Sequence, residues 1–269
     1  MNVLPLSHPQ NILPLFPQPQ LALVTEALAA GNSPGTIWVD DEDCPQSAFI
    51  WDRAHCFYYG GEECNETFND SIKELMTEIV PEALHNNFTL FKAYYTSPVW
   101  KDHLFSLFEK WNPHMRTRMF FTYQGIEQEI HGPIPHYSLH TIDDDLLSSS
   151  LKNMNYIIQE IESCWCSLSR FLTHGGGYCL SDKGTIIAWC TAEYVSEKKC
   201  GVGIETLPPH EGHGCATFLA STLVNSSLSK GVCPHWDSWA DNNASIRVAE
   251  KVGFKRIKEY SVLFGSFIQ

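Results

Sequence analysis

One short segment near the C-terminal end of the chain restricts the fold more than any other. Residues 208–220 read PPHEGHGCATFLA and follow an apolar, strand-like segment at residues 198–207. Two prolines end a strand because they cannot donate ladder hydrogen bonds, and glycines permit backbone angles that other residues avoid. An apolar helical pattern then runs to about residue 230, where Gly231 ends it. The segment predicts a strand, a glycine-bearing turn and a helix in direct succession.

The start of a helix has chemistry that suits such a turn. Its first N–H groups have no intrahelical partners, and it carries a partial positive charge. Beside glycines, this backbone can bind phosphate oxygens without a basic side chain. Two other phosphate motifs are excluded, because Cys215 and Ala216 stand where Lys and Ser/Thr would be needed, and Thr217 stands where a dinucleotide loop has its third glycine. A turn that binds nothing is the alternative.

The rest of the chain alternates between strand and helix patterns. In the first half these are strands at 36–40, 47–52 and 55–60, a helix at 69–84, a strand at 88–96, a helix at 99–111 and a strand at 117–124. In the second half they are strands at 137–143, 178–182, 185–194, 198–207 and 234–240, helices at about 214–230 and 244–253, and closing strands from 254. The expected fold class is α+β, with a mixed sheet flanked by helices in the C-terminal half and a smaller α+β domain before it.

A polar, proline-bearing stretch at residues 128–136 is the preferred domain boundary. It predicts an N-terminal α+β domain of residues 1–130 and a C-terminal domain of residues 131–269, sizes that are ordinary for domains. Both halves have a similar order of strands and helices, although the first lacks the glycine turn. Divergent duplication and coincidence are both consistent with this pattern.

Charge restricts the partners. The chain of 269 residues has 18 Lys and Arg against 31 Asp and Glu, a formal net charge of −13. Nucleic-acid and anionic-membrane binding depend on basic patches, so neither partner is expected. No segment approaches the roughly 20 apolar residues of a membrane span, the N-terminus does not resemble a secretion signal, and a cytoplasmic location is expected. An acidic field suits a cationic amine substrate, although a soluble acidic surface is the simpler explanation. A homodimer is left open.

The cysteines indicate buried thiols rather than disulfides or a metal site. Four of the ten lie in apolar strand or helix patterns, namely Cys179, Cys190, Cys200 and Cys215. The pair Cys164-x-Cys166 lacks zinc-ligand spacing and has no matching second pair. His210 and His213 lie close to Cys215 in the sequence, but no metal is expected there.

Two motifs resemble those of the GNAT acyl-CoA N-acetyltransferases. Residues 211–216 (EGHGCA) resemble motif A, Arg/Gln-x-x-Gly-x-Gly/Ala, and residues 242–254 (NNASIRVAEKVGF) resemble motif B, N-x-x-[AS]-x-R-[LV]-x-E-K-x-G-F. The second match covers most positions of its motif. The order of elements over residues 137–269 is also similar to that of the superfamily. The two-part layout is similar to the GNAT subgroup that contains the zwittermicin A resistance acetyltransferase.

The resemblance implies acetyl-CoA, or another short acyl-CoA, as cosubstrate, with no metal. The diphosphate would bind backbone amides of the turn, and the pantetheine would pair with the strand before it. A V-shaped opening between this strand and the strand at 235–240 would hold the thioester. The second motif's Asn would lie near the pantetheine, or cap its helix. The implied cofactor-binding residues are Ile204, Thr206, Leu207, Glu211, Gly212, His213, Gly214, Cys215, Ala216 and Asn242.

Two positions depart from the family pattern. Glu211 replaces Arg or Gln and brings a negative charge near the expected diphosphate. Ala249 replaces the Tyr that often protonates the departing thiolate. An acyl-CoA-binding sensor without catalysis therefore remains an alternative function.

Acetyl transfer to an amine needs a base near that amine. Glu205 and Glu193 lie on the two strands before the turn, in apolar surroundings that would raise a carboxyl pKa. We expect Glu205 to act as base or to organise a water, with Glu193 next, and solvent-facing carboxylates are the alternative. Backbone N–H groups near Thr206 and Leu207 would polarise the carbonyl, as the resemblance implies. The candidate acids are Tyr260, Ser245 and, more weakly, Tyr194.

The expected function is transfer of an acetyl group from acetyl-CoA to a primary amine of a small cationic molecule. Acetylation of a protein N-terminus or lysine is the alternative among enzymes. Cys215 could gain nucleophilicity at a helix N-terminus, but a packing role is expected there. His213 is expected to face solvent.

Overall fold

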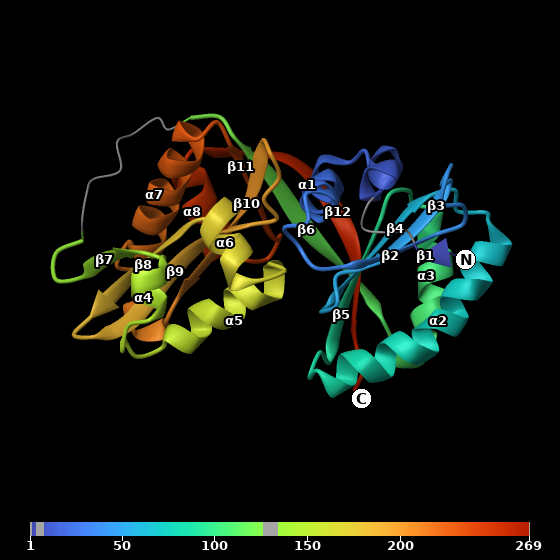
Figure 1. Cartoon of the computed structure of the whole chain (residues 1–269), viewed down its shortest axis with the longest axis horizontal. Helices are drawn as coiled ribbons and strands as arrows, with labels where there is room; N and C mark the ends of the chain where they lie inside the picture. The colour runs from blue at the N-terminus through green and yellow to red at the C-terminus, as the bar shows by residue number, and fades with distance from the viewer. Residues whose placement is uncertain (1, 4–7, 126–133, 269) are drawn as a thin grey trace. The chain divides into compact units, whose positions relative to one another are not determined.

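The chain divides into two compact units in the computed structural model, which describes residues 2–3, 8–125 and 134–268 (Figure 1). The first unit comprises Met1–Arg118 and Tyr260–Gln269, and the second comprises Met119–Glu259. The predicted boundary at residues 130/131 lies outside the described residues. Strands β6 (His114–Tyr123) and β12 (Phe254–Ser266) each have residues in both units. Residues 260–269, which sequence interpretation placed in the C-terminal domain, belong to the first unit.

The first unit is built on strands in the order β1-β2-β3-β4-β5-β12. These strands are β1 (Asn2–Val3), β2 (Thr36–Val39), β3 (Ser47–Trp51), β4 (Cys56–Gly61) and β5 (Leu90–Tyr95). The helices are η1 (Pro9–Leu15), α1 (Pro19–Ala29), α2 (Glu66–His85), α3 (Trp100–Phe108) and η2 (Glu109–Trp111). Strands β2 to β4 form the predicted antiparallel meander, β4 pairs with β5 in parallel, and β12 runs antiparallel to β5.

Aromatic side chains hold the first unit together. Helix α2 presents Phe68, Ile72, Met76 and Ile79 at helical spacing, and all four are buried. They join a core cluster with aromatic residues of the sheet and of α3 that includes Phe49, Trp51, Phe57, Tyr59, Phe91, Trp100 and Phe108. Burying one such side chain stabilises the fold by about 1.5–3 kcal/mol. The helix predicted at 69–84 is thereby confirmed, with its start earlier, at Glu66.

The second unit has the strand order β6-β11-β10-β9-β8-β7. Its strands are β7 (Ser138–Thr141), β8 (Gly177–Asp182), β9 (Thr185–Glu193), β10 (Lys199–Thr206) and β11 (Cys233–Trp239). Its helices are α4 (Asp144–Leu147), α5 (Met154–Cys164), α6 (Leu168–His174), η3 (Pro208–His210), α7 (Cys215–Ser229) and α8 (Asn243–Lys251). Strands β7 to β10 are antiparallel, and β10 pairs with β11 in parallel. The segment predicted as closing strands is the single strand β12.

The two units share one order of elements. In the first, antiparallel strands lead into β4, α2, the parallel strand β5 and α3. In the second, antiparallel strands lead into β10, α7, the parallel strand β11 and α8. Strand β6 follows α3 and η2 in the sequence, and strand β12 follows α8. Strand β12 follows α8 of the second unit in sequence but pairs with β5 of the first.

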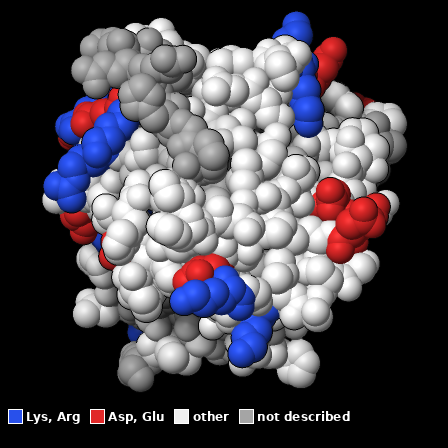
Figure 2. Space-filling model, turned by 90° about the vertical axis from the view of Figure 1, so that its left-hand side faces the viewer, with Lys and Arg blue, Asp and Glu red and all other residues white. Residues whose placement is uncertain are grey.

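All ten cysteines are free thiols, and Cys179, Cys190, Cys200 and Cys215 are buried, as predicted. Among the described residues, no helix is long and apolar enough to cross a membrane. On the face drawn in Figure 2, uncharged side chains predominate, and Lys and Arg are scattered in small groups.

Candidate active site

The turn between β10 and α7 is exposed and presents unused hydrogen-bond donors. The N–H of Leu207 donates to the carbonyl of Ile187 (2.9 Å), and a short 3₁₀ turn follows. Gly212 and Gly214 have φ angles of +76° and +85°, which cost other residues about 1–2 kcal/mol each. Within the described part of the chain, the N–H groups of residues 212–217 have no backbone acceptor, and no side chain caps α7. These donors suit anionic oxygens.

The side chains of the turn leave its backbone open to solvent. A Cβ placed on Gly212 or Gly214 would meet no atom within 4 Å. Glu211 and His213 are exposed, as was expected for His213. Burial raises the pKa of the Cys215 thiol, which supports a packing role and argues against a thiolate nucleophile.

Strands β10 and β11 pair over a short distance only. The parallel register joins Lys199–Gly201 to Cys233–His235, whereas β10 continues to Thr206 and β11 to Trp239. Beyond Gly201, no strand of the described residues is paired with the edge of β10 that faces β11. Unpaired N–H and C=O groups along such an edge can bind an extended chain. The pairing ends where the resemblance places a V-shaped opening.

One face of the β9–β10 pair carries the two predicted carboxylates. The register pairs Gly201 with Glu193 and Gly203 with Thr191, and paired residues point to the same face. Glu205 lies on this face too, opposite Trp189. The carboxylate of Glu193 leans over Gly203, where a Cβ would collide with its oxygen. A glycine on β10 therefore makes room for the acidic side chain of β9.

Helix α5 covers this face and adds a third carboxylate. Tyr156 of α5 stacks on Trp189 with ring centroids 5.8 Å apart. The pKa of Glu205, an exposed side chain, is raised, first by partial desolvation and then by the charges of Glu160 and Glu211. A carboxylate with a raised pKa is a better base at neutral pH. Sequence interpretation missed Glu160, although its position three residues after the buried Ile157 places it beside the apolar stripe of α5.

Two buried polar groups on this face have no hydrogen-bond partner among the described residues. They are Nε1 of Trp189 and Oγ1 of Thr191. Buried polar groups of folded proteins usually have a partner in the protein, in ordered water or in a ligand. Their position on β9 is consistent with a face that binds a polar molecule.

The residues of the second motif have mainly structural contacts. Asn242 accepts a hydrogen bond from the N–H of Ser245 (3.1 Å) and so caps α8. The hydroxyl of Ser245 accepts a hydrogen bond from Nε1 of Trp236 (2.9 Å). Ala249 is fully buried and offers no hydroxyl. Tyr260 lies in the first unit with its ring 6.3 Å from that of Tyr94, so its role as acid stays a prediction.

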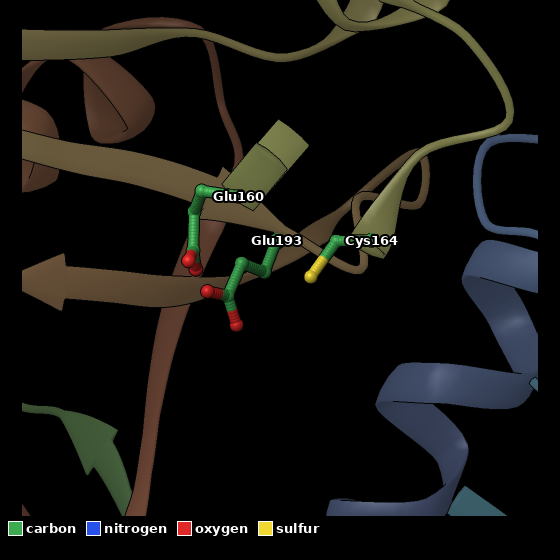
Figure 3. A group of neighbouring side chains, drawn as sticks. All are labelled: Glu160, Cys164 and Glu193. Carbon is green, nitrogen blue, oxygen red and sulfur yellow. The ribbon is translucent and has the colours of Figure 1, made fainter. Parts of the chain in front are cut away.

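The ring of His210, which lies near Cys215 in the sequence, contacts Tyr137 in the structure. Nδ1 of His210 lies 3.1 Å from the hydroxyl of Tyr137, which gives that ring a protein partner. A different group of potential ligands, Glu160, Cys164 and Glu193, has its ligand atoms within 4.8 Å of one another (Figure 3).

Comparison with known proteins agrees with this architecture. An uncharacterized N-acetyltransferase of Bacillus subtilis (strain 168), YdfB, is 29% identical over 233 residues, which are 86% of this chain and 85% of the relative. A solved GCN5-related N-acetyltransferase-like protein from Streptococcus suis has a TM-score of 0.69 at 18% identity, over 97% of this chain and 98% of that one. A tandem GNAT protein from the clavulanic acid biosynthesis pathway has a TM-score of 0.57 at 12% identity, over 99% and 98%. The two solved structures support the fold.

The sequence profile of GNAT acetyltransferases matches residues 13–263. The resemblance carried by the two motifs covered only residues 137–269, so the family match extends well into the first unit. The chain therefore belongs to the GNAT acetyltransferase family.

Proposed function

We propose that this protein transfers an acetyl group from acetyl-CoA to a primary amine of a small cationic molecule. The observation that carries the proposal is the position of three carboxylates, Glu160, Glu193 and Glu205, on the face next to the unpaired edge of β10. A concentration of negative charge attracts ammonium groups. Desolvation, and then the charges of Glu160 and Glu211, raise the pKa of Glu205, which improves it as a base.

The residues of the turn fit the cosubstrate. Amides of residues 212–217 have no backbone acceptor in the described chain, so they would hold the diphosphate. The edge of β10 from Ile204 to Leu207 would pair with the pantetheine arm. Bound acetyl-CoA supplies the activated acetyl group. Glu211 is exposed and can turn its carboxylate into solvent, so it does not prevent binding by the backbone.

The three carboxylates would have two roles, binding of the ammonium group and acceptance of its proton. Glu193 and Glu160 would hold the incoming ammonium group by charge, since a positive group near them removes part of their mutual repulsion. Glu205 would accept the proton that leaves the amine, directly or through one water. N–H groups near Thr206 would polarise the acetyl carbonyl. The acid stays open, because Ala249 removes the hydroxyl that the family pattern provides.

The first unit is proposed to be a degenerate GNAT-like domain. Its strands and helices follow the same order as those of the second unit, including the parallel β4–β5 pair and the crossover helix α2. The family profile begins at residue 13, within this unit. The similar chain of the clavulanic acid pathway is named a tandem GNAT protein, which supports duplication.

An acyl-CoA-binding sensor is the second candidate, because Ala249 is buried at the position where the family pattern has a Tyr. Thiol release from acetyl-CoA, measured with polyamines, aminoglycosides and lysine-containing or N-terminal peptides, separates the possibilities. Release with a polyamine or an aminoglycoside supports the proposal. Release with peptides alone would show a protein acetyltransferase. If no amine caused release while acetyl-CoA still raised the melting temperature, the sensor would be favoured.

The role of Glu205 is tested by the pH dependence of kcat/KM. Its pKa in the folded protein is raised above the ordinary value of a Glu carboxyl, so the active carboxylate is lost as the pH falls through that raised value. Glu205→Gln should lower kcat/KM about 100-fold and remove the acidic limb, with acetyl-CoA binding unchanged. Glu197→Gln, at an exposed position in the β9–β10 turn, is the matched control. An acidic limb that persists in Glu205→Gln would exclude this residue as the base.

A further inference from the structure

Three potential metal ligands from α5 and β9 converge beside the acidic face. Glu160 and Cys164 lie four residues apart on α5, and Glu193 is the last residue of β9. Residues four apart on a helix share one side of it. Their carboxylate oxygens and the Sγ atom all lie within 4.8 Å of one another. In Figure 3, the carboxylates of Glu160 and Glu193 lie side by side and the sulfur of Cys164 points toward Glu193.

Two neighbouring groups respond to the negative charge of this cluster. The pKa of the buried Cys190 thiol is raised by its burial first, and then by the charges of Glu193, Cys200 and Glu160. The pKa of Glu205 is raised by desolvation first, and then by the charges of Glu160 and Glu211. The negative charge of the cluster therefore acts on both groups, and a concentration of negative charge attracts cations.

A buried hydroxyl beside the cluster independently indicates a missing partner. Thr191 is 2% exposed, and its Oγ1 has no hydrogen-bond partner among the described residues. This oxygen lies 3.0 Å from the point where a Cβ of Gly203 would stand, and the carboxylate of Glu193 occupies the same place. An unpaired buried hydroxyl costs about 1–3 kcal/mol. A bound cation with a water molecule would give it a partner.

We propose that Glu160, Cys164 and Glu193 bind a thiophilic divalent cation such as Zn²⁺. Zinc accepts carboxylate oxygen at about 2.0–2.2 Å and thiolate sulfur at about 2.3 Å, so two of its tetrahedral ligands are about 3.5 Å apart. Rotation of the two flexible Glu side chains closes the present separation to that value. Cys164 binds as a thiolate and releases its proton to solvent. Three protein ligands leave a fourth position for water, which faces Thr191.

The choice of a thiophilic cation follows from the ligand set. Mg²⁺ and Ca²⁺ take oxygen ligands, whereas a thiolate with two carboxylates suits Zn²⁺, Co²⁺ or Cd²⁺. One consequence rests on the proposed function: Glu193 would bind both the metal cation and the ammonium group of the acceptor. The two would then exclude one another, and the metal would regulate access of the amine to the acidic face.

Titration of the purified full chain with Co²⁺, in the absence of acetyl-CoA and of any amine, tests the site. We expect a cobalt–thiolate absorption band that added Zn²⁺ removes. Cys164→Ser and Cys164→Ala should abolish the band, and Glu160→Gln and Glu193→Gln should weaken Co²⁺ binding at least about tenfold. The controls are Cys166→Ser and Glu162→Gln, whose side chains are exposed near the same helix end and should leave the band unchanged.

The outcomes separate the site from other cysteines and from loss of folding. The absence of a band in the wild-type chain at a large excess of Co²⁺ would overturn the proposal. A band that survives both Cys164 variants would do the same, because it would come from another thiol. The melting temperature without metal identifies a variant that has unfolded, and the two Glu variants keep Cys164 and test the site without it. No step depends on acetyltransferase activity, so failure here leaves the proposed function untouched.

Discussion

The two units contain the same connection from a strand through a turn into a helix, but the two turns treat the helix N-terminus differently. In the second unit, Gly214 precedes α7 and no side chain caps it. In the first, Asn65 caps α2 by accepting a hydrogen bond from the N–H of Phe68 (3.1 Å). Its Nδ2 also donates to a carboxylate oxygen of Asp40 (3.0 Å). The N-terminus of α7 offers backbone N–H donors without a cap, whereas at the N-terminus of α2 one such N–H group is bound by Asn65.

The two turns also differ in the negative charge near them and in how far the neighbouring parallel strands stay paired. The first turn reads GEECNE from Gly61 to Glu66 and so places three carboxylates near the start of α2. Strand β4 pairs with β5 up to its last residue, Tyr95, and the N–H of Thr96 extends the contact to the carbonyl of Tyr59. Strand β10 leaves β11 after Gly201. The two features that the proposed cosubstrate site needs, an uncapped helix start and separated strands, therefore occur together at the second turn and not at the first.

The largest expected effect contrasts the glycines of the two turns. Gly61 has φ +84°, and a Cβ there would collide with the carbonyl of Gln46. Gly61→Ala should lower the free energy of unfolding by about 3 kcal/mol, from left-handed strain and a forced backbone shift. Gly214→Ala, with φ +85° and open space, should lose only about 1 kcal/mol. Urea unfolding compares them, and equal losses would refute the contrast.

Closing the open turn should abolish most cosubstrate binding. Gly214→Asn introduces the residue type that caps α2 and that tolerates a positive φ. Its side-chain oxygen would compete for the free amides, so the affinity for CoA should fall about 30-fold. The control is Gly231→Asn, because Gly231 also has a positive φ (+75°) and open space but lies at the other end of α7. Unchanged CoA binding by calorimetry in Gly214→Asn would argue against diphosphate binding at this turn.

The two capping asparagines provide a smaller test. Asn65→Ala and Asn242→Ala should each lower the free energy of unfolding by about 1 kcal/mol, because each removes one N-cap hydrogen bond. Asp at either position should preserve most of the cap. If Asn242 acts only as a cap, Asn242→Asp will bind CoA like the wild type. A loss of CoA affinity in a stably folded Asn242→Asp would instead indicate a contact with the pantetheine.

The smallest effect concerns the acidic residue of the open turn. Glu211→Gln removes a negative charge from the N-terminal side of α7, so CoA should bind about two- to threefold more tightly. The gain should shrink at high ionic strength, since exposed charges are screened. Titration of CoA at low and high salt measures both quantities. A gain that does not depend on salt would mean that Glu211 acts through backbone conformation instead.

Much of the fold was predictable because local patterns specify it. Pro208 and Pro209 mark the end of β10, Lys183-Gly184 marks the β8–β9 hairpin, and the apolar spacing of α2 defines its buried side. Which strand β12 joins was not predictable, because alternation specifies faces but not partners. Tyr260 follows the second motif closely in sequence, yet its strand passes into the first unit at this residue.

The candidate site was predictable only where sequence neighbours become spatial neighbours. Glu193 and Glu205 were found because both lie on strands that precede the turn, and the β9–β10 register then places them on one face. Glu160 comes from a helix about thirty residues earlier and enters the site through packing of α5 on β9, which depends on tertiary structure. The room above Gly203 likewise depends on that register. These contacts are not encoded in any single segment.

The antiparallel pairing of β12 with β5 has a consequence for biosynthesis. The first unit acquires strand β12 from residues that leave the ribosome after those of the second unit. Until then, the edge of β5 around Phe91 and Ala93 has no β12 partner, and exposed apolar edges invite aggregation. A chain interrupted before residue 260 would therefore lack a strand of the unit whose synthesis began first, and that unit can close only after the second unit has been made.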